Sequence, residues 1–198
     1  GTTFPATVSG FNPTLASGCA PPSSVPNPAG DACRYDFVRD IDLIGENEQT
    51  SFLAKGTLKL GGETYLSLEY LRSQLDSTNR VAPTPLVGMT IPGTSPFYPA
   101  GATGNIVNWR TTEAGKRTDE NEAVGDRILL DVTGSALGWD YRAGLFRSTN
   151  EVETNFIDGY VQSPAIEAGV INGTLNPFGP QTAAGSALIN SSKVLGTV

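Results

Sequence analysis

Residues 52–70 read FLAKGTLKLGGETYLSLEY, and the pattern in this stretch decides the fold. Apolar residues before the central glycines fall at even positions, namely Phe52, Ala54, Leu58 and Leu60. After the glycines the alternation continues at Leu66, Leu68 and Tyr70. A period of two is typical of a β-strand with one apolar and one polar face. Gly61-Gly62-Glu63 between the two halves predicts a tight hairpin turn.

The same alternation recurs on both sides of this hairpin. Further along the chain, residues 128–132 and 139–145 alternate in the same way, and Gly134 to Gly138 predicts a second hairpin turn between them. Before the first hairpin, residues 35–43 carry apolar side chains at odd positions, whereas residues 52–60 carry them at even positions. That change of phase requires either a tight hairpin or a bulge in one long strand near Gly45-Glu46-Asn47.

Proline divides the chain into strand blocks and loops. Prolines are absent from 29–82 and from 100–163, and proline cannot donate to a β ladder. We therefore expect strand blocks at about 33–73 and 121–161. The remaining segments are expected to be loops, at about 1–32, 74–120 and 162–198. Within the last loop, Ser163-Pro164 predicts a short helix through about Ile171, and a second is expected from about Pro180 to Leu188.

The connections differ greatly in length. Two are tight turns, whereas roughly 45 residues separate the strand ending near Arg72 from the next one, which is long for a compact soluble domain. Short turns at one end and long loops at the other are typical of transmembrane β-barrels. The fold class predicted is therefore all-β, an antiparallel up-and-down transmembrane β-barrel segment with long extracellular loops. Tyr65 and Trp139 beside the turns are expected to form an interfacial girdle. Periodicity alone leaves a soluble sandwich open, in which the apolar face meets a second sheet.

Composition excludes several kinds of chemistry. The 198 residues contain no His and only two Cys, and the net charge is −7. Triads that need an imidazole base, thiolate zinc sites and iron–sulfur clusters therefore lack their residues. The acidic balance argues against a nucleic-acid partner. No P-loop or G-x-S-x-G motif occurs, so we predict no catalytic, cofactor-binding or metal residues, and no individual ligand-binding residue is nominated.

Two features carry site predictions. Cys19 and Cys33 would close a 15-residue loop, in which a disulfide would stabilise the fold by roughly 3 kcal/mol and indicate an oxidising location; two unrelated free thiols are the alternative. The second feature is the run of acidic residues Asp36, Asp40, Asp42, Glu46 and Glu48. Calcium binding is one interpretation, but no D-x-D-x-D-G loop is present, so a solvated or lumen-facing surface is favoured.

Several segments resemble TonB-dependent outer-membrane receptors. Cys33-Arg34-Tyr35-Asp36-Phe37 and Glu48-Gln49-Thr50-Ser51-Phe52-Leu53 resemble a barrel strand and turn of that family. Leu66-Ser67-Leu68-Glu69-Tyr70, followed by Ala82-Pro83-Thr84-Pro85, is similar to the next strand and loop. Asn108-Trp109-Arg110-Thr111 through Gly115-Lys116-Arg117, and Leu175-Asn176-Pro177-Phe178-Gly179-Pro180, extend the likeness over about 33–185.

The resemblance implies active uptake of a nutrient, such as a ferric siderophore or an oligosaccharide, across the outer membrane of a Gram-negative bacterium, without enzymatic activity. Family members have a barrel of about 22 strands, filled by a plug whose TonB box engages the TonB-ExbB-ExbD complex. No plug, TonB box or terminal strand is seen here, so we expect an internal barrel segment. Its partners would be the rest of the barrel with its plug, outer-membrane lipid and a small-molecule ligand held by loops 1–32, 74–120 and 149–190.

Two other functions are kept as alternatives. A secreted all-β binding or adhesion module would pair the apolar faces into a sandwich. A carboxylate-based glycoside hydrolase would need two carboxyl groups a fixed distance apart, and no pair stands out in the sequence.

Overall fold

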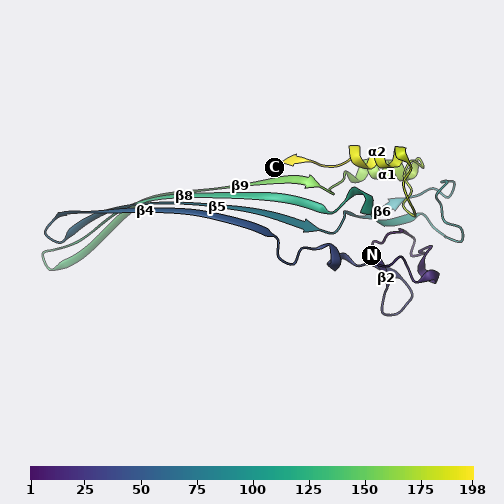
Figure 1. The fold of residues 1–198 in the computed structure, drawn as a ribbon, viewed down its shortest axis with the longest axis horizontal. Coiled ribbons are helices and arrows are strands. Elements are labelled where there is room, and N and C mark those ends of the chain that lie inside the picture. The colour runs from purple at the N-terminus through teal and green to yellow at the C-terminus, as the bar shows by residue number, and fades with distance from the viewer. The chain divides into compact units, whose positions relative to one another are not determined.

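Four long strands in two hairpins dominate the computed structural model (Figure 1). They are β4 (Glu46–Gly61), β5 (Thr64–Val81), β8 (Arg117–Ala136) and β9 (Trp139–Asp158). The structure describes all 198 residues, of which 51% are in strands and 14% in helices, so the chain is mostly antiparallel β. With the short β10 (Gly196–Thr197), the long strands form one sheet in the order β10-β9-β8-β5-β4.

Both predicted hairpin turns are confirmed. Strands β4 and β5 pair antiparallel, with Gly61 opposite Thr64 and Glu46 opposite Thr78. Gly62 in that turn has φ +53°, a left-handed conformation that glycine adopts without steric cost. The second turn joins β8 to β9 through Leu137 and Gly138, which have φ +55° and +80°. Positive φ at both central residues matches the right-handed twist of the flanking strands.

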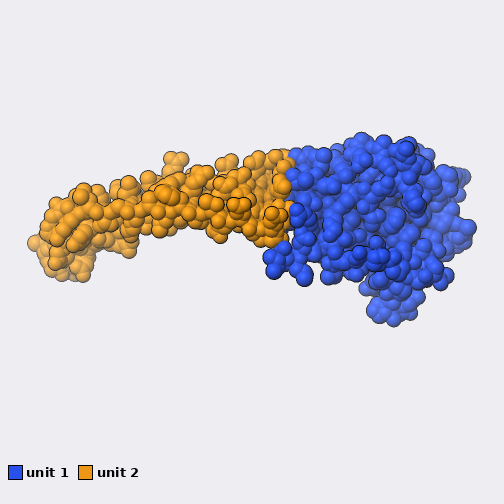
Figure 2. All heavy atoms as spheres, viewed as in Figure 1, with its two compact units in different colours: residues 1–44, 79–119, 156–196 blue, residues 45–78, 120–155, 197–198 orange.

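The chain divides into two compact units, coloured separately in Figure 2. Unit 1 contains residues 1–44, 79–119 and 156–196. Unit 2 contains residues 45–78, 120–155 and 197–198, and therefore most of the four long strands together with both hairpin turns.

Unit 1 is built from short elements. Its strands are β1 (Thr7–Val8), β2 (Ser24–Pro26), β3 (Cys33–Tyr35), β6 (Pro85–Thr90) and β7 (Ile106–Arg110). They form a three-stranded sheet in the order β1-β7-β6 and a two-stranded sheet of β2 and β3. Its helices are the 3₁₀ helices η1 (Leu15–Ser17), η2 (Phe37–Asp40) and η3 (Thr112–Ala114) and the α-helices α1 (Ser163–Ile171) and α2 (Ala183–Ser191).

A hydrophobic core holds unit 1 together. Residues from all three of its chain segments are buried in one cluster, which includes Val8, Ile91, Trp109, Ile166 and Leu175. Each of these five side chains is essentially fully buried. Burying a large apolar side chain stabilises a fold by about 1.5–3 kcal/mol. Most of the segments expected to be loops, at 1–32, 74–120 and 162–198, therefore pack into a folded unit.

The strand predicted at 35–43 is wrong. β3 ends at Tyr35, and η2 follows over Phe37–Asp40. The hydroxyl of Tyr35 donates a 2.5 Å hydrogen bond to Asp40 Oδ2, which closes the chain into this turn. The side chains of Phe37 and Val38 remain more than half exposed, so their alternation reflects no sheet face. β4 begins after this segment, so neither a hairpin nor a bulge explains the change of phase near Gly45-Glu46-Asn47.

The bounds of the strand blocks also differ from the predicted 33–73 and 121–161. β5 continues to Val81 and β8 begins at Arg117. The sequence pattern did not predict these extensions, because their mostly polar side chains show no alternation although the backbone is paired in the sheet. The predicted loop 74–120 also contains β6 and β7. β6 begins at Pro85 itself, which is the first position of a strand and one that proline tolerates.

The helix predicted at Ser163–Ile171 is confirmed, with proline in its first turn. α2 lies three residues later than predicted, because the Thr182 side chain caps it by accepting a hydrogen bond from the Gly185 N–H at 3.1 Å. None of the helices has the length and apolar character needed to cross a membrane.

Candidate functional site

The sheet of unit 2 has one face that is mostly apolar. The β4–β5 register places Leu58 opposite Leu66 and Gly56 opposite Leu68. Contacts across the sheet extend this face to β8 and β9, since Tyr70 bonds Asp126 and Thr64 bonds Tyr141. We call it the apolar face; its residues are Phe52, Ala54, Leu58, Leu60, Leu66, Leu68, Tyr70, Ile128, Leu130, Val132, Trp139, Tyr141, Ala143 and Leu145. Leu58 is 60% exposed and Leu145 is 76% exposed, so nothing in unit 2 covers this face.

The opposite face carries most of the ion pairs of the sheet, together with apolar side chains such as Leu53, Leu71 and Phe146. Glu69 accepts a 2.8 Å hydrogen bond from Arg127 and lies 3.8 Å from the Lys55 ammonium. Arg142 is paired with Asp131 at 2.9 Å. Hydroxyl groups also face one another across β4 and β5, with Thr57 and Ser67 3.0 Å apart. We call this surface the polar face. The ion pairs on this face are partly exposed to solvent.

The apolar face ends at a defined level on each strand. On β4 it spans nine residues, Phe52 to Leu60, which is within the roughly 9–11 residues of a tilted transmembrane β-strand. On the same face, Arg72 of β5 lies opposite Phe52, and Asp126 of β8 and Arg147 of β9 stand next to the last apolar residues of their strands. Arg72 and Asp126 form an ion pair at 3.3 Å. We call this level the charged boundary. Beyond it most side chains of the strands are polar, although Leu75 of β5 and Val152 of β9 are apolar and exposed.

The two aromatic residues beside the turns do not form one girdle. Trp139 is 77% exposed and belongs to the apolar face. Tyr65 pairs with Lys59 in the β4–β5 register, next to the Leu58–Leu66 pair, so it lies on the polar face. The Lys59 ammonium is 5.7 Å from the centre of the Tyr65 ring. Tyr65 and Trp139 therefore lie on opposite faces of the sheet, and an interfacial position of Trp139 stays a prediction.

A cavity of about 420 Å³ lies beyond the charged boundary in unit 2. Its acidic lining residues are Glu46, Glu48, Asp76, Glu120, Glu122 and Glu153. The Gln74 amide donates to Glu122 at 3.0 Å and to Asp76 at 3.2 Å. No group of three or more ligating side chains is arranged to hold a metal ion.

The structure disperses the acidic run considered for calcium. Glu46 and Glu48 line the cavity of unit 2, whereas Asp36, Asp40 and Asp42 belong to unit 1. Asp42 is 3.4 Å from Arg80, and Asp40 is 3.7 Å from Lys116. These two carboxylates are thus balanced by cations of unit 1.

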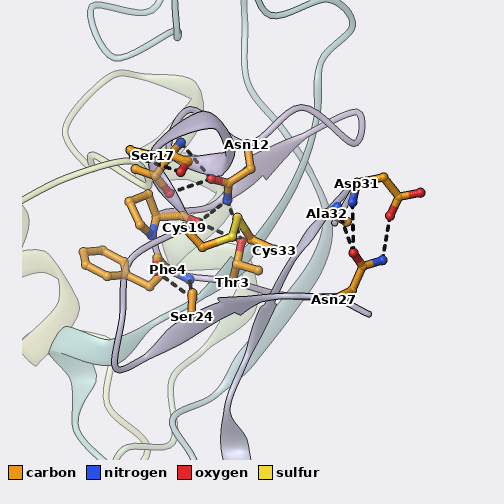
Figure 3. Close-up of a disulfide and its surroundings, with 12 residues drawn as sticks. Thr3, Phe4, Asn12, Ser17, Cys19, Ser24, Asn27, Asp31, Ala32 and Cys33 are labelled. Carbon is orange, nitrogen blue, oxygen red and sulfur yellow. Dashed lines mark hydrogen bonds between the residues drawn. A yellow bond between two sulfur atoms is a disulfide. The ribbon is translucent and has the colours of Figure 1, made fainter. Parts of the chain in front are cut away.

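The structure brings Cys19 and Cys33 together in a disulfide in unit 1, with their Cα atoms 5.7 Å apart (Figure 3). Around it, the Asn12 side-chain amide donates to Thr3 Oγ1 at 3.2 Å and to the Pro5 carbonyl at 2.9 Å. The Ser24 hydroxyl also accepts a hydrogen bond from the Phe4 N–H and donates one to the Phe4 carbonyl. The disulfide and these hydrogen bonds tie residues 1–35 into one piece.

A charged cluster surrounds Tyr35 in unit 1. The Arg110 guanidinium lies 5.1 Å from the centre of the Tyr35 ring, and its Nη1 donates to the Pro83 carbonyl at 2.8 Å. Burial, and then the hydrogen bond to Asp40, raise the pKa of Tyr35. Burial, followed by the positive charge of Arg117, lowers the pKa of Arg110. The cluster joins β3, η2 and β7 through these contacts.

Sequence reasoning missed this cluster and the fold of unit 1. The loops 1–32 and 74–120 were expected to be ligand-facing, as was 149–190, of which residues up to 158 belong to β9. One signal was available: Trp109, Ile91 and Val107 are apolar residues in a predicted loop, and all three are fully buried. No protein-family model, curated protein or solved structure matches this chain.

Proposed function

We propose that the chain is part of an outer-membrane transporter of the TonB-dependent class, which takes up a nutrient such as a ferric siderophore or an oligosaccharide. The observation that carries the proposal is the uncovered apolar face of unit 2, opposite a polar face of ion pairs. In an outer-membrane barrel the first faces lipid and the second faces the lumen.

Two further features support the same assignment. The nine-residue span from Phe52 to Leu60 suits a tilted strand crossing an apolar layer about 25 Å thick. Both turns of the sheet are short, whereas the connection from β5 to β8 contains folded parts of unit 1. Such asymmetry is typical of barrels whose periplasmic turns are short and whose external loops are long.

In this proposal the five strands of the sheet are completed by further strands, because known barrels start at about eight. The remaining barrel, its plug and the TonB-ExbB-ExbD complex are the protein partners. Unit 1 is assigned to capture of the small-molecule ligand outside the membrane, and its disulfide suits that oxidising side.

The alternative, a secreted β-sandwich module, predicts a second sheet over the apolar face. Within unit 2 that face is open, with Leu68 50% exposed and Phe52 57% exposed. Exposed apolar surface of this extent marks a site that contacts lipid or another protein.

The test is fractionation of the source cells, followed by an immunoblot with an antibody against residues 82–116. The proposal expects a band much larger than 20.7 kDa in the outer-membrane fraction, which resists extraction by carbonate and dissolves in detergent. A band in the soluble or culture fraction that needs no detergent contradicts the proposal and favours the secreted module.

A further inference from the structure

A small groove of about 270 Å³ opens on the apolar face of unit 2 at the charged boundary. Its lining residues are Tyr70, Asp126, Arg127, Ile128, Arg147 and Thr149. Ile128 belongs to the apolar face, whereas Arg147 and Thr149 begin the polar part of β9. The groove therefore has apolar protein surface on one side and polar side chains on the other.

The charged side chains at this groove differ in whether they have a partner of opposite charge. Asp126 accepts a 2.6 Å hydrogen bond from the Tyr70 hydroxyl and is paired with Arg72 at 3.3 Å. The guanidinium of Arg127 is held by Glu69 of the polar face at 2.8 Å. The side chain of Arg147 makes no hydrogen bond or ion pair within the chain, and the residue is exposed. The groove thus offers one free guanidinium.

A free guanidinium beside apolar surface defines the chemistry of its ligand. Arginine presents a planar fork of N–H donors that matches the oxygens of a phosphate group. The Thr149 hydroxyl is a second possible donor at the same rim. Ile128 and Leu145 continue the surface toward the apolar face, where an acyl chain would lie. A phosphate joined to an acyl chain fits both halves.

We propose that this groove binds the phosphate group of a membrane lipid through Arg147, with an acyl chain of the lipid on the apolar face. This inference rests on the proposed function, because it requires the apolar face to contact the bilayer. It adds a defined lipid-binding position at the charged boundary of β8 and β9.

The experiment uses the protein that contains these residues, extracted from its membrane fraction with detergent. Native mass spectrometry measures the occupancy of added dioleoyl phosphatidic acid, with dioleoylglycerol as the phosphate-free probe. We expect phosphatidic acid to bind more tightly than dioleoylglycerol. Arg147→Gln should weaken phosphatidic acid binding by about tenfold or more, the value of a charge-assisted hydrogen bond. Arg147→Lys keeps the charge and should retain part of the binding.

The matched control is Arg142→Gln, which removes an arginine of the same strand from the polar face and should leave lipid occupancy unchanged. Equal occupancy in the wild type and Arg147→Gln would overturn the inference, as would equal loss in Arg142→Gln. Displacement of the lipid by millimolar inorganic phosphate would assign the groove to free phosphate and would also overturn it. A protein absent from the membrane fraction would instead refute the proposed function, so the two failures are distinguishable.

Discussion

The hydroxyl of Tyr141 on β9 lies 2.7 Å from the hydroxyl of Thr64 on β5, although β8 separates these two strands. The contact depends on Gly134 of β8. A Cβ atom at this position would overlap the oxygen and ring carbons of Tyr141. Glycine therefore lets the tyrosine ring cross the middle strand and join the two hairpins near their turns.

Gly134→Ala is expected to push the Tyr141 ring away and break its contact with Thr64. Overpacking of this kind costs typically about 1–3 kcal/mol in free energy of unfolding. The measurement is denaturant-induced unfolding of the purified protein. Gly56→Ala is the matched control, because a Cβ there meets no atom within 4 Å; it should be neutral or slightly stabilising. Equal loss of stability in both variants would contradict this account.

Leu68→Arg is expected to lower the free energy of unfolding by about 2–4 kcal/mol if position 68 lies near the bilayer midplane. Ser67→Arg on the polar face of the same strand is the control and should cost much less. Glu69→Gln should be nearly neutral, because its ion pairs with Lys55 and Arg127 are partly exposed. Vesicle unfolding measures all three variants. Equal tolerance of arginine at 67 and 68 would argue against lipid at the apolar face.

Replacing both Cys19 and Cys33 with serine removes the disulfide that closes this loop. Loop-closure entropy predicts a loss of roughly 3 kcal/mol for a loop of this size. The loss should be confined to unit 1. Hydrogen exchange should therefore accelerate in residues 1–35 and stay unchanged in the β4–β5 hairpin. Reduced wild-type protein should behave like the double variant, and unchanged exchange in both samples would refute the prediction.

The raised pKa of Tyr35 predicts that the folded protein loses stability at alkaline pH. Its folded pKa is raised by burial and by Asp40, whereas an unfolded tyrosine ionises at about pH 10. Above that pH the unfolded chain releases a proton that the folded chain retains, so stability falls as pH rises toward the folded pKa. Below about pH 10 this residue adds no pH dependence.

The comparison protein for this prediction is Tyr35→Phe. The difference in free energy of unfolding between wild type and Tyr35→Phe should be constant at neutral pH and shrink above about pH 10. Tyr160, whose pKa is also raised by burial and by Asp119, is present in both proteins and cancels. A difference that stays constant through the alkaline range would show that Tyr35 ionises normally.

Local patterns predicted the elements whose determinants are local. The glycines at 61–62 and at 138 specify two hairpins, and proline in the first turn marks α1. The strand at 35–43 failed because alternation over nine residues can arise in a turn. There the hydrogen bond from Tyr35 to Asp40, and not a neighbouring strand, organises the backbone.

Other features depend on contacts that no local pattern records. The outer parts of β5 and β8 are mostly polar and show no regular alternation, so only their pairing in the sheet reveals them as strands. The cluster of Tyr35, Asp40 and Arg110 unites segments far apart in sequence. A position beside a turn does not show which face the Tyr65 side chain occupies, and the pairing of Tyr65 with Lys59 determines it.

The amino-acid sequence by itself determined that this protein is built on two-faced β-hairpins, because a period of two and left-handed turn residues act within a few positions of one another. Only the tertiary structure decided that the proline-rich segments 1–44, 79–119 and 156–196 fold into a unit with a core around Trp109. The reason is physical: a buried core forms from side chains distant in sequence, and its stability comes from apolar surface removed from water after those segments meet.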